Sequence, residues 1–288
     1  MKTSEQLKGA IRNAAKDMNL HAQEVLQIFM FERLIERLSV SAYRENFILK
    51  GGLLIASMIG IGERTTMDMD TTVQGLPMEE GNMVRIIKEI LAIDVEDGIA
   101  FEYVDTQPIR EEDEYSNYCI IIRANYGKMK VPMKIDITTG DEITPRQIDY
   151  SYQFMFEDKR VLVKAYPLET IIAEKYETII RRNIGNTRAR DFYDLYMLYN
   201  LKTDMIRWDI LKQAIIATAT KRNSLEDLKD YIEIIEEMKE SDYLVGIWNN
   251  YQSANTYTGK VNFNDALIAA KSIGDGIINS QKHLLMPD

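Results

Sequence analysis

Met67-Asp68-Met69-Asp70-Thr71-Thr72-Val73, residues 67–73, is the stretch that decides the fold of this chain. Side chains alternate between the two faces of a β-strand, so a strand here places Asp68 and Asp70 together on one face. The two carboxylates then stand roughly 6.6 Å apart along the strand. A divalent cation such as Mg²⁺ or Mn²⁺ relieves the repulsion between carboxylates this close. A solvated polar strand face is the alternative interpretation of the same pattern.

A third carboxylate follows on a second predicted strand, residues 130–138. Its apolar residues take one face, while Lys134 and Asp136 take the other. If this strand neighbours the first, three carboxylates cluster at one edge and form the ligand set of a two-metal phosphoryl-transfer site. The alternative is that Asp136 is simply exposed on an outer sheet face.

Gly51-Gly52 lies between a short apolar strand, residues 47–49, and a helical pattern over residues 53–59. Small residues at such a junction let a phosphate approach the backbone N–H groups at the start of a helix. A tight structural turn is the alternative. The Gly-Lys-Ser or Gly-Lys-Thr of a P-loop does not occur, which disfavours that class.

Composition indicates an ordinary globular protein of one large domain or two smaller ones, with 288 residues, 45% apolar and 28% charged, and a net charge of −10. The sequence shows neither a signal peptide nor a membrane-length apolar run, so we expect a cytoplasmic protein. The only cysteine, Cys119, lies in an apolar run and is expected to pack in the core. The two histidines, His21 and His283, lie far apart in sequence, so chemistry must rest on carboxylates, lysine and arginine.

The pattern of elements predicts an α+β fold in two parts. Two helices, over residues 4–18 and 21–38, are expected to precede an α/β region with a mixed or antiparallel sheet, a helix over residues 79–93 and a hairpin turn at residues 125–128. We place a boundary near residue 160, between a first domain of residues 1–160 and a helical domain of residues 161–288. Pro167 is expected to open the first helix of that domain, and Thr187 to cap the next.

Lys175 lies on the apolar face of the helix that Pro167 opens, three or four residues from Ile171, Ile172 and Ile179. A lysine there must extend its ammonium to solvent or meet an anion. Asp191 borders the buried side of the next helix. The two residues are therefore expected either to pair with each other across adjacent helices or to face the cleft beside Asp68 and Asp70.

The ordered motifs resemble the signature of the AbiEii/AbiGii nucleotidyltransferase toxins. They are Lys50-Gly51-Gly52, Arg64 to Asp70, Lys134-Ile135-Asp136, Ala173-Glu174-Lys175 and Arg188 to Asp194. The resemblance implies a bilobed protein with a DNA polymerase β-like nucleotidyltransferase core, a mixed sheet and a helical C-terminal lobe. It also implies the toxin of a type IV toxin–antitoxin system, of the kind used in phage defence by abortive infection.

The implied activity is the metal-dependent transfer of a nucleoside monophosphate from an NTP, for example GTP, to the 3′ end of tRNA. This modification would block translation. The implied catalytic residues are Asp68, Asp70, Asp136, Lys175 and Asp191. Asp68, Asp70 and Asp136 would bind Mg²⁺ or Mn²⁺, and Gly51, Gly52, Arg64 and Lys175 would bind the nucleotide. We expect a monomer with an antitoxin encoded alongside that need not bind it directly.

The motif departs from the superfamily at Leu53, where Ser or Thr commonly follows the glycines. We expect Ser57, Thr65 or Thr66 to supply the missing hydroxyl. Two other functions compete with the leading one. A metal-dependent nuclease uses a similar set of acids, and a nucleotide-binding module without turnover could dock a partner on the acidic stretch of residues 226–242. That stretch is most simply the solvated face of a helix.

Overall fold

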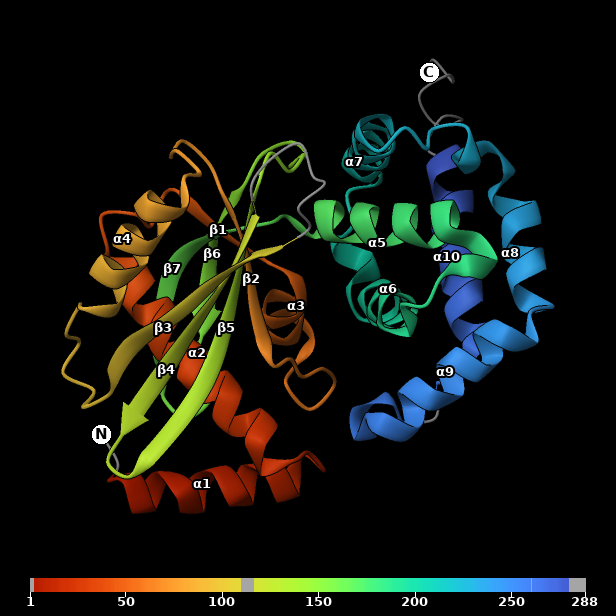
Figure 1. The fold of residues 1–288 in the computed structure, drawn as a ribbon. Helices are drawn as coiled ribbons and strands as arrows, with labels where there is room; N and C mark the ends of the chain where they lie inside the picture. The colour runs from red at the N-terminus through yellow and green to blue at the C-terminus, as the bar shows by residue number, and fades with distance from the viewer. Residues whose placement is uncertain (1–2, 110–116, 260, 280–288) are drawn as a thin grey trace. The chain divides into compact units, whose positions relative to one another are not determined.

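The computed structural model describes residues 3–109, 117–259 and 261–279, which divide into two compact units. The first comprises residues 1–141 and 147–166, and the second comprises residues 142–146 and 167–288. The expected boundary was residue 160, whereas the structure keeps residues 160–166 with the first unit. Figure 1 shows the course of the chain.

The first unit contains a seven-stranded mixed sheet in the order β3-β4-β5-β2-β1-β7-β6. Its strands are β1 (Phe47–Lys50), β2 (Asp68–Val73), β3 (Ala100–Ile109), β4 (Asn117–Tyr126), β5 (Met129–Thr139), β6 (Ile148–Gln153) and β7 (Arg160–Ala165). Its helices are α1 (Ser4–Asp17), α2 (Ala22–Val40), α3 (Gly51–Ile59) and α4 (Glu80–Leu91). Strand β6 was not predicted from the sequence, because its alternation carries polar and aromatic residues rather than aliphatic ones.

Helix α2 crosses one face of the sheet, behind the strands in Figure 1. On this face the strands present alternate apolar residues such as Ile122, Met133 and Ile135, which are buried. Arg37 of α2 reaches the same face and stacks on the Phe101 ring at 4.8 Å. The opposite face of β2 and β5 carries the aspartates, as the alternation of both strands predicted.

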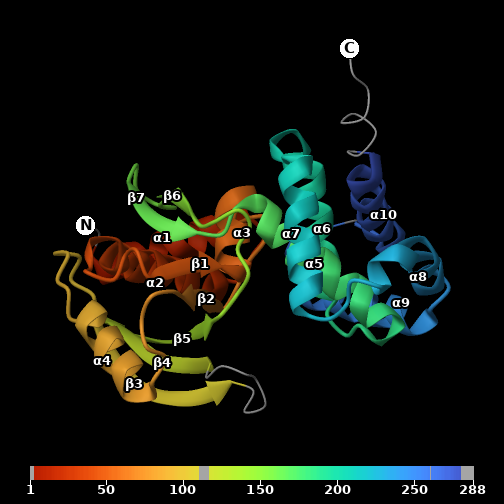
Figure 2. The same cartoon turned by 90° about the horizontal axis from the view of Figure 1, so that it is seen from above.

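The hairpin between β4 and β5 forms as predicted, with antiparallel pairing up to Tyr126 and Met129. Gly127 occupies the turn with a φ of +58°, a conformation that glycine adopts without steric cost. Figure 2 shows these two strands beside β3 at one side of the sheet. The hairpin therefore fixes the register of the strand that carries Asp136.

The second unit is helical. Its helices are α5 (Leu168–Arg182), α6 (Ala189–Lys202), α7 (Trp208–Lys221), α8 (Tyr231–Lys239), α9 (Asp242–Ala254) and α10 (Phe263–Asn279). Short 3₁₀ turns lie at Asn183–Gly185, Thr203–Met205, Asp227–Asp230 and Thr256–Thr258. Helix α5 lies between α6 and α7 (Figure 1) and is in contact with both.

Two predicted helix starts differ from the observed ones. Pro167 is the N-cap of α5 rather than its first residue, and Arg188 rather than Thr187 caps α6. Asn186 forms a turn just before α6, because its side-chain oxygen accepts a hydrogen bond from the Arg188 N–H at 2.9 Å. The acidic stretch of residues 226–242 is solvated as predicted: its acids are exposed, apart from the partly exposed Asp227.

None of the helices in the described part of the chain combines the length and apolar character that crossing a bilayer requires.

Candidate active site

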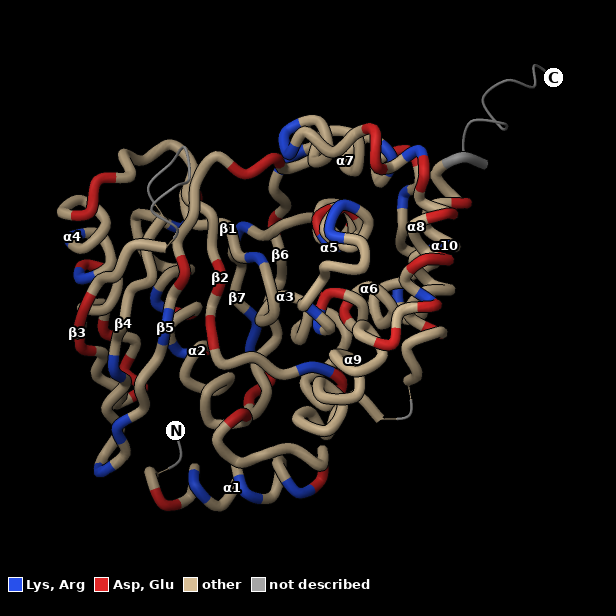
Figure 3. Tube along the Cα trace, turned by 45° about the vertical axis from the view of Figure 1, so that its right-hand side comes forward, with Lys and Arg blue, Asp and Glu red and all other residues tan. Residues whose placement is uncertain are grey.

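A single row of side chains crosses four strands on the open face of the first unit's sheet. Lys50 on β1 pairs with Asp70 on β2, which pairs with Asp136 on β5, and Asp136 pairs with Cys119 on β4. Partners in such a register point to the same face and lie about 5 Å apart. Figure 3 shows the acidic positions of β2 and β5 on neighbouring strands. The structure thus brings Asp70 and Asp136 together, as the sequence predicted.

Asp68 shares this face but lies one alternation away from the row, where its partner on β5 is Lys134. Among residues 3–109, 117–259 and 261–279, no three His, Cys, Asp or Glu side chains form a group that could hold a metal ion. Asp70 and Asp136 are therefore a lateral pair with Asp68 beside them, rather than a converged trio. The register of β2 with β5 sets this arrangement, because Asp68 and Asp70 are two residues apart on the same strand.

The chemistry of the pair fits a hard divalent cation. Burial raises the pKa of Asp136, a hydrogen bond with Cys119 lowers it, and the charges of Asp70 and Asp68 raise it further. In the described structure, Asp70 forms no ion pair with a lysine or arginine, and its hydrogen bond is a long one of 3.4 Å from the Gly52 N–H. Carboxylate oxygens on neighbouring strands are ligands of the kind that Mg²⁺ or Mn²⁺ prefers.

Gly51 and Gly52 were expected to form a turn before the helix, but they are the first two residues of α3. Gly51 has a φ of +67°, and a Cβ atom built on it would lie 2.0 Å from Asp70 Oδ2. Only glycine therefore fits between β1 and the Asp70 carboxylate. The start of α3 presents backbone N–H groups next to this carboxylate, where a phosphate could also bind.

Arg64 and Leu53 lie beneath this helix start. Arg64 is 1% exposed, and a Cβ atom on Gly52 would lie 2.9 Å from its guanidinium. Its guanidinium also donates to the carbonyl of Thr65. Leu53 is fully buried and belongs to the core of the unit. Arg64 is consequently placed to support the glycine pair from behind.

The three hydroxyls expected to compensate for Leu53 differ in position. Ser57 donates to the carbonyl of Leu54, and Thr65 donates to Glu24. Thr66 alone of the three lies against Gly52, because a Cβ atom there would be 3.0 Å from its hydroxyl oxygen. This hydroxyl donates to the carbonyl of Asp68 at 3.1 Å, so it links the glycine pair to the start of β2.

Cys119 was predicted to pack in the core, but this prediction was wrong. The residue is partly exposed and lies next to Asp136 on the aspartate face. The period of β4 explains the error: both of its faces carry apolar residues near Cys119, so the apolar run gives no face assignment. Burial, together with the hydrogen bond to Asp136 and the charge of Asp136, raises the pKa of Cys119 to about 12. The thiol is therefore a proton donor to the carboxylate.

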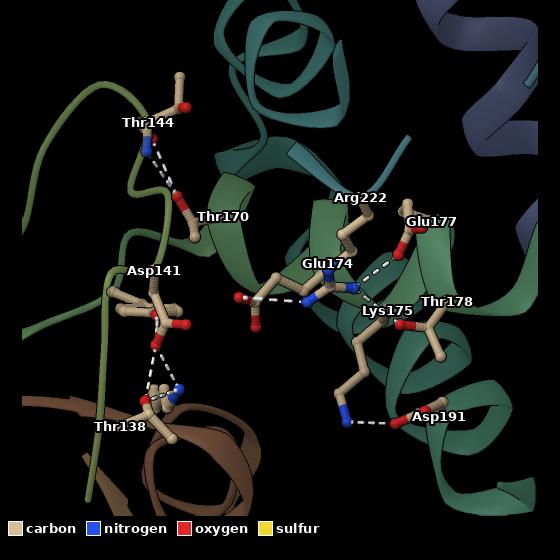
Figure 4. A network of polar contacts seen from close by, with 12 residues as sticks. Thr138, Asp141, Thr144, Thr170, Glu174, Lys175, Glu177, Thr178, Asp191 and Arg222 are labelled. Carbon is tan, nitrogen blue, oxygen red and sulfur yellow. Dashed lines mark hydrogen bonds and ion pairs between the residues drawn. The ribbon is translucent and has the colours of Figure 1, made fainter. Parts of the chain in front are cut away.

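Asp141, Thr138 and Tyr166 form a cluster around Lys50 that was not predicted from the sequence. The Lys50 ammonium donates to Asp141 at 2.5 Å and to Thr138 at 2.7 Å. Burial would raise the pKa of Asp141, but Lys50 and the hydrogen bonds from Thr138 and Tyr166 lower it to about 2. Figure 4 shows Thr138 and Asp141 side by side. The alternation of side chains along the strands could have predicted that Lys50 lies beside Asp70. The position of Asp141 could not be predicted in this way, because Asp141 follows Gly140 outside any periodic pattern.

In the second unit, Lys175 and Asp191 pair across α5 and α6 at 2.6 Å, the first of the two arrangements expected from the sequence (Figure 4). Asp194 is a further partner of Lys175 at 3.0 Å. The exposed fractions of the side chains are 15% for Lys175, 3% for Asp191 and 0% for Asp194. Arg188 adds a second cation beside Asp191 at 2.8 Å.

Comparison with known proteins identifies the family of the chain. Two solved structures from Helicobacter pylori share its fold at 16% sequence identity, a putative nucleotidyltransferase and the protein JHP933. The putative nucleotidyltransferase has a TM-score of 0.52, and the alignment covers 93% of this chain and all of that one. JHP933 has a TM-score of 0.51, and the alignment covers 92% of this chain and 97% of that one. No curated protein sequence matches the chain significantly. The family model described as nucleotidyl transferase AbiEii toxin, type IV toxin–antitoxin system, matches residues 33–255, and the chain belongs to this family of nucleotidyltransferases.

Proposed function

We propose that this protein is a metal-dependent toxin that transfers a nucleoside monophosphate from an NTP to the 3′ end of tRNA. The observation that carries the proposal is the lateral pairing of Asp70 with Asp136 beside the glycine start of α3. Family membership supports the transferase chemistry and the toxin role. Modification of the tRNA 3′ end would prevent aminoacylation and thereby stop translation.

In the proposed reaction, the terminal 3′ hydroxyl oxygen of the acceptor attacks the α-phosphorus of the NTP. The new phosphorus–oxygen bond forms as the bond to the bridging oxygen breaks, and pyrophosphate leaves with that electron pair. Asp136 accepts the proton of the hydroxyl as general base. Asp68, Asp70 and Asp136 would hold Mg²⁺ or Mn²⁺, which stabilises negative charge on the phosphates and activates the hydroxyl.

Backbone groups and two basic side chains are proposed to bind the nucleotide. The backbone N–H groups at Gly51 and Gly52 are suitable donors to phosphate oxygens. Lys175 is proposed to contact the triphosphate, with Asp191 and Asp194 orienting its ammonium. Arg64 contributes positive charge from beneath Gly52.

The open face of the sheet supports a polyanionic acceptor. Lys130 and Lys134 are exposed on β5, on the same face as Asp136, and Arg123 lies on that face of β4. Although the chain has a net charge of −10, these three cations share a sheet face with the proposed metal ligands, and Lys134 is the direct cross-strand partner of Asp68. Basic side chains beside a transfer site attract the phosphates of RNA.

The test uses purified protein, Mg²⁺, total RNA and each of the four NTPs labelled on the α-phosphate. We expect a labelled band of tRNA size, with GTP as the preferred donor, and no label with Asp70→Asn. Asp105→Asn, on an exposed position of β3, is the matched control and should label like the wild type. Absence of transfer with every NTP would refute the proposal, and RNA shortening without NTP would instead indicate a nuclease.

Two further parts of the proposal concern partners. We propose that the protein acts as a monomer, which light scattering at micromolar concentration can check. We also propose an antitoxin encoded alongside that neutralises the toxin without binding it directly. Co-expression should then restore growth while affinity purification of the toxin recovers no antitoxin. NTP binding without turnover, with toxicity that survives Asp68→Ala, would favour a sequestering module instead.

A further inference from the structure

Lys50 lies next to a proposed metal ligand but is paired with a different carboxylate. It stands directly opposite Asp70 in the antiparallel pairing of β1 with β2, so the two side chains share a face. The ammonium is nevertheless 2.5 Å from Asp141 Oδ2 and 2.7 Å from Thr138 Oγ1. The described contacts of Asp70 include no ion pair with this lysine.

The position of Asp141 is itself fixed by several contacts. Asp141 Oδ2 accepts hydrogen bonds from the Thr138 hydroxyl at 2.8 Å and from the Tyr166 hydroxyl at 2.9 Å. The Tyr166 ring centroid lies 5.7 Å from the Lys50 ammonium, within the range of a cation–π interaction. The side chains of Lys50 and Asp141 are 15% and 24% exposed, so both ions are largely withdrawn from water.

Without Asp141, the lysine would have a clear alternative partner. Cross-strand partners place their Cβ atoms about 5 Å apart, and the flexible lysine stem can span that distance. An ammonium on Asp70 would neutralise the carboxylate and occupy the oxygen that a divalent cation needs. Without a carboxylate partner, Lys50 would thus compete with the metal for Asp70.

We propose that Asp141 is a positioning residue that holds Lys50 away from Asp70 and so keeps Asp70 available to a divalent cation. The inference rests on the proposed metal-dependent function. Asp141 touches neither metal nor substrate in this scheme, and it acts only through Lys50. Thr138 and Tyr166 hold Asp141 in the orientation that receives the ammonium.

The test measures binding of Mn²⁺ directly, from the electron paramagnetic resonance signal of the free ion. The full-length wild type is compared with Asp141→Asn, Lys50→Gln and the double variant. Asp141→Asn is expected to weaken Mn²⁺ binding about five- to tenfold, because the released lysine competes for Asp70. The double variant should return to within about twofold of the wild type, since the competitor has been removed.

Asp149→Asn is the matched control, because it removes a carboxylate partner from a different lysine of the same sheet. Lys164 pairs with Asp149 at 2.8 Å and with Glu45 at 3.0 Å, on β7 rather than beside Asp70. The Mn²⁺ affinity of the Asp149→Asn variant should equal that of the wild type. If Asp141→Asn does not fold by circular dichroism, Tyr166→Phe removes one bond to Asp141 and should cause a smaller loss of affinity that Lys50→Gln reverses.

Four outcomes separate the possibilities. Wild-type affinity in both Asp141→Asn and Tyr166→Phe overturns the inference, as does a double variant that binds as weakly as Asp141→Asn. A wild-type protein that binds no Mn²⁺ overturns the proposed metal-dependent function itself. Weak binding in Asp141→Asn that Lys50→Gln restores confirms the positioning role.

Discussion

At the scale of a residue, Gly51 is the position where the structure leaves least freedom. Its φ of +67° and the 2.0 Å approach of Asp70 Oδ2 to a built Cβ atom mean that a methyl group must displace the carboxylate. Gly51→Ala is therefore expected to abolish nucleotide transfer and to lower the free energy of unfolding by about 1–3 kcal/mol. Chemical denaturation and the labelling assay measure the two effects.

Gly81→Ala is the control for this prediction. Gly81 lies in α4, and a Cβ atom there meets nothing within 4 Å. The substitution should stabilise the helix by up to about 1 kcal/mol and leave transfer unchanged. A Gly51→Ala variant as active as Gly81→Ala would contradict the proposed close fit of Asp70 against α3.

Individual residues also show how far the sequence alone could go. The alternation of β2 and β5 was enough to put Asp70 and Asp136 on one face, because strand geometry has a period of two. The same rule could not place Asp141, which lies beyond β5, or assign Cys119 to a face in a strand with apolar residues on both sides. Side chains outside a periodic element need tertiary information.

At the scale of an element, α2 contains an acid whose protonation should be coupled to folding. Glu32 is 1% exposed; burial raises its pKa from 4.5 to about 8, although a hydrogen bond from the Met155 N–H and the charge of Arg33 oppose this. The folded protein keeps a proton that the unfolded chain releases between pH 4.5 and about 8. Stability from this group is therefore complete below pH 4.5 and is lost as the pH rises towards 8.

The measurement is the free energy of unfolding by urea between pH 5 and 8. We expect Glu32 to contribute a decrease on the order of 3 kcal/mol over this interval. Glu32→Gln keeps the shape of the neutral acid and should remove that part of the slope. A slope that Glu32→Gln leaves unchanged would show that Glu32 is ionised in the folded protein.

Helices α5 and α6 depend on the Lys175 ion pairs for stability. Asp194 is completely buried and Asp191 nearly so, and both lie within 3.0 Å of the ammonium. Removing one partner of a buried ion pair is costly, so Lys175→Met should lower the free energy of unfolding by roughly 3 kcal/mol. Lys221→Met, at an exposed position of α7, should change it by less than about 0.5 kcal/mol.

This expectation affects how activity data are interpreted. Loss of transfer in Lys175→Met could follow from instability as well as from a lost phosphate contact. Binding of NTP must therefore be measured below the unfolding temperature of the variant. The helical pattern of α5 identified Lys175 correctly as a lysine on an apolar face, but it did not predict Asp194 as a second carboxylate partner of that lysine.

At the scale of the whole molecule, the chain crosses between its units more than once. Residues 142–146 belong to the second unit, although residues on both sides of them belong to the first. Within the second unit, the Thr170 hydroxyl accepts from the Thr144 N–H and donates to its carbonyl, each at 3.0 Å (Figure 4). The sequence predicted a single boundary, because no composition change marks this short excursion.

Thr170→Val removes both of these hydrogen bonds while keeping the shape of the side chain. Because Thr170 is fully buried, the variant should lose about 1–3 kcal/mol of stability. Amide hydrogen exchange of residues 142–146 should also become faster. Thr220→Val, on an exposed position of α7, is the control, and equal exchange in both variants would show that Thr170 does not hold this segment.

The location of Cys119 has a practical consequence for spectroscopy. It is the only thiol of the chain, it is partly exposed, and it adjoins Asp136. A fluorophore attached there would report on the carboxylate row without any engineered cysteine. The Cys119 pKa of about 12 leaves little thiolate at neutral pH, so labelling should be slow and should become faster as the pH rises. Reaction rate alone would then report how the surroundings of Asp136 change when ligands bind.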